Sequence, residues 1–124
     1  MMIAVHQSGG VVLSAASREY AADRLTAALL RAEGHIRGVR VFVADCNGPK
    51  GGADKMCTVT VALAWGRPVT VVQRATTVTA AVDGAAHRAG QTVQRTVEKR
   101  AGTRRRLRAL VRLVRGLFGK REGK

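Results

Sequence analysis

Two stretches of alternating residues, 39–44 and 57–63, constrain the fold more than any other feature of the sequence. Apolar side chains occupy every second position in both, namely Val39, Val41 and Val43, then Cys57, Val59, Val61 and Leu63. A period of two indicates a strand with one buried face. The connection between them, residues 45–55, contains three glycines, one proline and two lysines, which favour a loop. The sequence therefore predicts a hairpin with a long connection.

The chain is small and strongly basic. Its 124 residues suffice for one two-layer core, and its formal net charge is +14. Such an imbalance favours a polyanionic partner, either nucleic acid or an anionic membrane surface. The N-terminal residues lack the basic start and the apolar core of a secretion signal, so we expect a cytoplasmic protein.

The remaining elements complete an α+β pattern. Residues 2–7 alternate like a strand, and a helix is expected from a cap at Ser14 or Ser17 to Glu33. Residues 65–67 form a tight turn before a strand at 69–74, and Thr76 or Thr77 caps a second helix over 78–100. The order β-α-β-β-β-α predicts a two-layer sandwich in which both helices cover one face of a four-stranded sheet. Gly84 and Gly90 inside the second helix indicate close packing or a close approach to a backbone.

Both expected helices carry cations beside their apolar seam. On the first, Arg24 and Arg31 share one stripe with Tyr20. On the second, Arg88, Arg95 and Lys99 lie within about 40° of one another. Solvated side chains whose stems cover apolar surface are the alternative for either helix alone. Two such edges in a chain of this charge favour a binding face.

Residues 101–124 differ from the rest of the chain, with nine basic residues and one acidic residue, Glu122. Apolar residues recur at helical spacing: Leu107, Leu110, Val111, Val114, Leu117 and Phe118. We expect a separate basic amphipathic helix, with a hinge at Arg104, Arg105 and Arg106. Three partners compete for it: RNA phosphates bound by these arginines, an anionic membrane, or an apolar groove on another protein or a second copy. Residues 1–100 and 101–124 are accordingly assigned as two domains.

Patterns for catalysis or metal binding are weak. The sequence GPKGGADK lacks the spacing and the hydroxyl of a phosphate-binding loop. Asp83 and His87, four residues apart, predict a helix-surface hydrogen bond rather than a metal site. Cys46 and Cys57 lack CxxC spacing, and two reduced thiols are favoured over a bridge across the loop. We expect a protein that is not an enzyme, without cofactor, metal or small-molecule substrate.

Residues 2–100 resemble the HPF/RaiA family of ribosome-associated proteins, also called the sigma-54 modulation or ribosome hibernation family. The resemblance rests on the GRPVTV strand, on AAVDGAAHRA in the second helix and on a DxNGxKGGxDKxC run formed by Asp45, Asn47, Gly48, Lys50, Gly51, Gly52, Asp54, Lys55 and Cys57. It implies a factor that occupies the small ribosomal subunit, where messenger and transfer RNA bind, and silences idle ribosomes.

The resemblance also implies which residues contact ribosomal RNA. In this family the phosphate contacts come largely from the two helices, which corresponds to Arg24, Arg31, Arg88, Arg95 and Lys99 here. Lys55 and Arg67 are weaker candidates at the sheet edge and the turn. Two other functions stay open: a peripheral membrane or partner-docking protein anchored by residues 101–124, and a general double-stranded-RNA-binding module.

Overall fold

The computed structural model describes residues 1–8, 11–45 and 55–122, and it describes side chains as far as residue 117, apart from that of Ser8. The predicted loop with Cys46, Lys50 and Asp54 lies outside the described residues. Two compact units are present, Met1–Gln94 and Arg95–Lys124. The assignment of residues 1–100 and 101–124 as domains stays a prediction.

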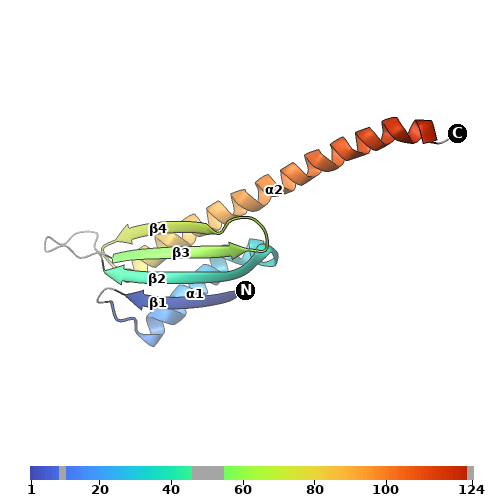
Figure 1. Ribbon diagram of the computed structural model, residues 1–124. Helices are drawn as coiled ribbons and strands as arrows, with labels where there is room; N and C mark the ends of the chain where they lie inside the picture. The colour runs from blue at the N-terminus through green and yellow to red at the C-terminus, as the bar shows by residue number, and fades with distance from the viewer. Residues whose placement is uncertain (9–10, 46–54, 123–124) are drawn as a thin grey trace. The chain divides into compact units, whose positions relative to one another are not determined.

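The elements occur in the predicted order. They are β1 (Met2–Ser8), α1 (Ala15–Leu29), the 3-10 helix η1 (Leu30–His35), β2 (Ile36–Asp45), β3 (Lys55–Leu63), β4 (Val69–Ala75) and α2 (Val78–Glu122). The sheet has the order β1-β2-β3-β4, in which β1 is parallel to β2 and the other pairs are antiparallel. Figure 1 shows α1 and the beginning of α2 on one side of this sheet. The predicted α+β sandwich is confirmed.

Strand register explains the core. Ile3, Val39, Val61 and Val69 form one cross-strand row, and Val5, Val41, Val59 and Val71 form the next. Val41 and Val59 are fully buried, whereas their sequence neighbours point to the open face of the sheet. The alternation of apolar and polar residues along each strand thus gives the sheet one face covered by helices and one exposed face, as the period of two predicted.

The helices begin at the predicted caps. Ser14 accepts a hydrogen bond from the Ser17 backbone N–H at 3.0 Å, and Thr77 accepts one from that of Ala80 at 3.1 Å. The first helix was expected to reach Glu33, but it changes to 3-10 geometry at Leu30. Leu25 and Leu29 of α1 are buried with Ala85 and Val93 of α2. Small residues along α2 let it lie close to the sheet.

The expected end of the second helix near Arg100 is wrong, because α2 continues to Glu122. Gly102 has no atom within 4 Å of where a Cβ would lie, and the residues from 104 to 115 that follow it are mostly arginine and leucine. One glycine costs a helix roughly 1 kcal/mol relative to alanine, which such strong helix formers offset. The hinge expected at residues 104–106 is helical.

Candidate nucleic-acid interface

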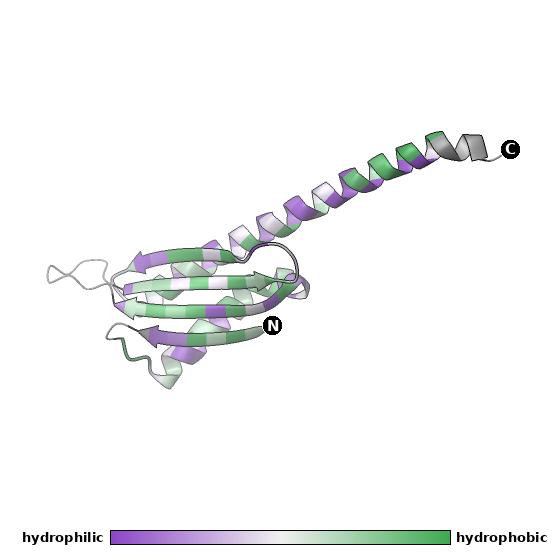
Figure 2. Cartoon of the chain, viewed as in Figure 1, coloured by the Kyte–Doolittle hydropathy of each residue, from purple (hydrophilic) through white to green (hydrophobic). Residues whose placement is uncertain are grey.

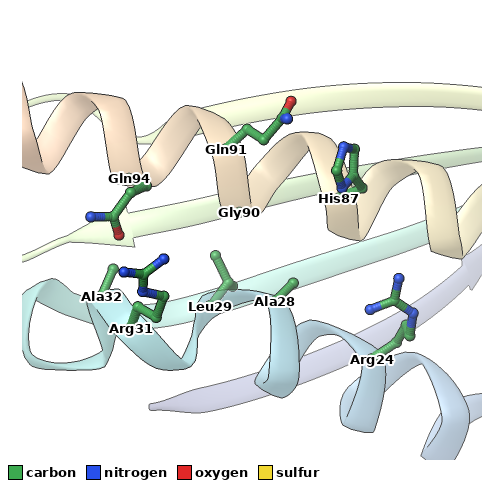
Figure 3. A pocket seen from close by; sticks show the side chains of 9 residues that line it. All are labelled: Arg24, Ala28, Leu29, Arg31, Ala32, His87, Gly90, Gln91 and Gln94. Atoms are coloured by element: carbon green, nitrogen blue, oxygen red, sulfur yellow. The ribbon is translucent and has the colours of Figure 1, made fainter.

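A groove between α1 and α2 gathers polar and cationic side chains on the helical side of the first unit. Its volume is about 320 Å³. Figure 3 shows the residues that line it: Arg24, Ala28, Leu29, Arg31, Ala32, His87, Gly90, Gln91 and Gln94. Apolar atoms form the floor, while two arginines, one histidine and two glutamines form the rim.

The floor depends on Gly90. A Cβ built there would lie 2.8 Å from the Ala28 carbonyl oxygen, so α2 approaches the backbone of α1 more closely than any side chain allows. The close packing or close approach to a backbone that the sequence indicates at Gly90 is confirmed. Because the helices meet at this point, the longer side chains on either side of it stand at the rim.

Arg24 belongs to a three-residue network. Its Nε atom lies 3.2 Å from Oδ1 of Asp83, and the Tyr20 hydroxyl donates a hydrogen bond to the same oxygen. This hydrogen bond to Asp83, with partial burial, raises the pKa of Tyr20. Asp83 therefore bonds across to α1, instead of to His87 as the sequence predicted. The Arg24 side chain stays 40% exposed, which leaves its terminal nitrogens able to contact an anion.

The other end of the groove carries Arg31. This arginine is exposed and makes no ion pair within residues 1–8, 11–45 and 55–117. Figure 3 shows Gln94 of α2 pointing towards it, while Gln91 points outward. The exposed His87 adds a further nitrogen on the α2 side. Arg31, without an ion pair among the described residues, and the partly neutralised Arg24 thus lie on one groove that amide and imidazole groups also line.

Arg88 does not join this groove. Its guanidinium donates a hydrogen bond to the backbone carbonyl of Val72 in β4, at the edge of the sheet. A step of one residue turns a helix by about 100°, which moves Arg88 from the α1 side, where His87 lies, to the β4 side. Arg88 therefore lies outside the groove that Arg24 and Arg31 line, and its contact with RNA stays a prediction.

The other predicted contacts are distributed over the molecule. Lys55 forms an ion pair with Asp45 at 3.1 Å, and both side chains are largely covered. Because this pair joins the ends of β2 and β3, Lys55 has a structural role. Arg67 is exposed in the turn between β3 and β4. The remaining candidates are exposed residues of the second unit: Arg95, Lys99, Arg104, Arg105 and Arg106.

Sequence reasoning missed His87, Gln91 and Gln94, the groove-lining residues of α2. Their spacing of four and three residues is a helical signal of one face. The lysine and arginine pattern does not mark this face, because its side chains are amides and an imidazole. Gly90, recognised for its packing, marks the side of α2 that meets α1 and so identifies this face.

Residues 5–101 match the family described as sigma 54 modulation protein / S30EA ribosomal protein. The chain belongs to this family. The predicted resemblance to the HPF/RaiA, or sigma-54 modulation, family is thereby confirmed, and it covers the helices and the sheet that form the groove. The sigma 54 modulation / S30EA family is one of ribosome-associated proteins. No curated protein sequence matches the chain significantly.

Two solved structures share the fold of this S30EA family member. The N-terminal domain of Protein Y from Thermus thermophilus aligns with a TM-score of 0.63 and 22% identity, over 77% of this chain and 99% of that one. A ribosomal subunit interface protein from Coxiella burnetii aligns with a TM-score of 0.64 and 18% identity, over 79% of this chain and 99% of that one. At such identities the likeness shows the fold alone.

Proposed function

We propose that this protein binds ribosomal RNA of the small subunit through the α1–α2 groove and thereby silences or protects idle ribosomes in the cytoplasm. The observation that carries the proposal is the joint placement of Arg24 and Arg31 around one open groove. Arginine presents several donors in a planar fork, which suits it to bind two phosphate oxygens at once. Family membership supports the ribosome as the source of those phosphates.

The proposed recognition concerns the RNA backbone rather than the bases. The chain has one tryptophan, one tyrosine and two phenylalanines, and therefore few side chains on which bases can stack. Tyr20 is further committed to Asp83 by its hydroxyl. The groove supplies N–H donors and positive charge, which suit phosphates whatever the sequence. Binding of this kind acts without catalysis, as a non-enzymatic occupant of the subunit.

Replacing Arg24 and Arg31 together by glutamine is expected to weaken binding to small subunits by about tenfold or more, because two charge-assisted hydrogen bonds are lost. The slope of log affinity against log salt should fall by about 1 for each arginine removed. Co-sedimentation with purified small subunits over a range of salt concentrations measures both quantities.

Arg40 and Arg74 supply the matched control. Both are exposed on the open face of the sheet, so their double replacement by glutamine removes the same charge away from the groove. We expect this control to bind with nearly native affinity. Equal weakening in both double variants would show that net charge, not the groove, determines binding. Equal affinity for free duplex RNA and for assembled subunits would instead indicate a general duplex-binding module.

Asp83→Asn is expected to strengthen binding to small subunits by about threefold, since it removes the charge that partly neutralises Arg24 while keeping an acceptor for Tyr20. Asp23→Asn is the control, because Asp23 is exposed on α1 and forms no ion pair among the described residues. The same sedimentation assay compares the two. A gain shared by both variants would contradict a specific effect at Arg24.

A further inference from the structure

We infer that residues 101–117 bind the surface of an anionic phospholipid membrane. This inference concerns the second unit, and it does not depend on the ribosomal proposal. Its starting point is a large amount of exposed apolar surface on one helix. The exposed fractions are 56% for Leu107, 58% for Leu110, 48% for Val111, 64% for Leu113, 45% for Val114 and 65% for Leu117.

These apolar side chains lie on one side of the helix. With residues about 100° apart, they span an arc of roughly 160°, from Leu113 through Leu110 and Leu107 to Val111. Five of the six arginines in the segment fall on a separate arc of roughly 100°. These five are Arg104, Arg105, Arg108, Arg112 and Arg115. Figure 2 shows the two kinds of surface running along different sides of this part of α2.

The charge of the segment distinguishes between a second copy of the chain, RNA and an anionic bilayer as the partner that covers its apolar arc. Residues 101–117 contain six arginines and no aspartate or glutamate. Pairing with a second copy would bring these arginine-rich flanks together, without acidic residues to neutralise them. RNA would neutralise the arginines, but phosphates leave six exposed apolar side chains in water. An anionic bilayer surface offers negative headgroups and acyl chains side by side, and so satisfies both sides of the helix.

The geometry of the segment fits a helix that lies in the interface. The 17 residues from 101 to 117 are helical and extend over about 25 Å. Among the described residues no helix is both long and apolar enough to cross a bilayer. A wide apolar arc beside an arginine arc is typical of helices buried to the depth of the headgroups. Two-stranded coiled coils need only a narrower seam.

Flotation of the full-length protein with vesicles tests the inference. Vesicles of phosphatidylcholine and phosphatidylglycerol in equal parts should capture the protein at physiological salt, and vesicles of phosphatidylcholine alone should capture at least about tenfold less. Leu110→Gln with Val114→Gln keeps the charge and the helix formers but removes two apolar contacts. This double variant should bind anionic vesicles at least about tenfold more weakly. Arg108→Gln with Arg112→Gln should lose binding to a similar extent on anionic vesicles only.

Met2→Gln with Val12→Gln is the matched control, because these side chains lie outside residues 101–117 and are 80% and 86% exposed. Its binding to vesicles should equal that of the parent protein. The inference is overturned if the parent ignores anionic vesicles. It is also overturned if Leu110→Gln with Val114→Gln abolishes a dimer seen by sedimentation without lipid, which would identify a second copy as the partner. A third contrary result is that Leu110→Gln with Val114→Gln binds anionic vesicles as tightly as the parent protein. The arginines alone would then determine binding, as they would for binding to RNA.

Discussion

Gly90→Val is expected to lower the free energy of unfolding by about 3 kcal/mol, because it forces a side chain into a contact between two backbones. A Cβ at this position would already lie 2.8 Å from the Ala28 carbonyl oxygen, and valine adds two methyl groups. A backbone carbonyl inside a helix cannot rotate away as a long side chain can. The two helices must therefore separate, and α2 loses part of its packing with Leu29 and Ala32.

Gly102→Val controls for the intrinsic effect of valine in a helix. A Cβ at Gly102 meets nothing within 4 Å, and glycine is the less favourable residue in a helix, so this variant should be neutral or slightly more stable. Chemical denaturation monitored by circular dichroism measures both variants. A loss of stability at Gly102 as large as that at Gly90 would contradict the packing argument.

The same substitution bears on the candidate site. Because Gly90 lies on the floor of the groove, separation of the helices moves Arg24 and Arg31 relative to His87 and Gln94. We expect the folded Gly90→Val protein to bind small subunits about as weakly as the double arginine variant, although every cation is retained. Native affinity in a destabilised Gly90→Val protein would show that the arginines act independently of the groove.

Most of the fold follows from local patterns in the sequence. Alternation of valines defined β2 and β3 and the face that each buries. The helix starts were predicted to within a few residues, at Ser14 or Ser17 and at Thr76 or Thr77, and Ser14 and Thr77 are the caps. These features depend on residues close together in the chain, which is why periodicity and capping predict them. The extent of α2 beyond Arg100 depends instead on a balance between one glycine and many favourable residues.

The site was less predictable because it depends on how the helices rotate against each other. Periodicity places Arg88 about a quarter-turn from the buried seam of α2, but it does not show which flank of the helix meets α1. Contacts distant in sequence decide this: Gly90 meets Ala28, and Arg88 reaches the Val72 carbonyl. Asp83 likewise finds Tyr20 and Arg24, residues some sixty positions away, instead of its helical neighbour.

Cys57 is expected to make the protein lose stability above pH 9. The side chain is fully buried in β3, and this burial raises the pKa of its thiol from 9.0 to about 12. In the unfolded chain the thiol ionises from pH 9 upward, whereas in the folded protein it stays neutral until about pH 12. The unfolded state alone gains from ionisation in this window, so stability is intact below pH 9 and falls as pH rises. The full loss is about 4 kcal/mol, of which about 3 kcal/mol occurs by pH 11.

Comparison with Cys57→Ala isolates this effect, because every other group titrates in both proteins. Cys46, which lies outside the described residues, is replaced by alanine in both chains so that Cys57 is the single thiol. Denaturation from pH 8 to about pH 11 should show the stability difference between the two chains change by about 3 kcal/mol in favour of the alanine variant. A constant difference would mean that the native thiol ionises as readily as the unfolded one.

The buried thiol also reports on the contact at Gly90. Cys57 points from the sheet towards the helices, in the same row as Val43 and Gln73, so a thiol reagent reaches it only when the two layers open. Where opening is rapid compared with modification, the rate of modification follows the population of the open state. A loss of about 3 kcal/mol in Gly90→Val therefore predicts modification about a hundredfold faster, and Gly102→Val predicts no acceleration. Acceleration in only the first of these variants would locate the closure of the core at the contact between Gly90 and Ala28.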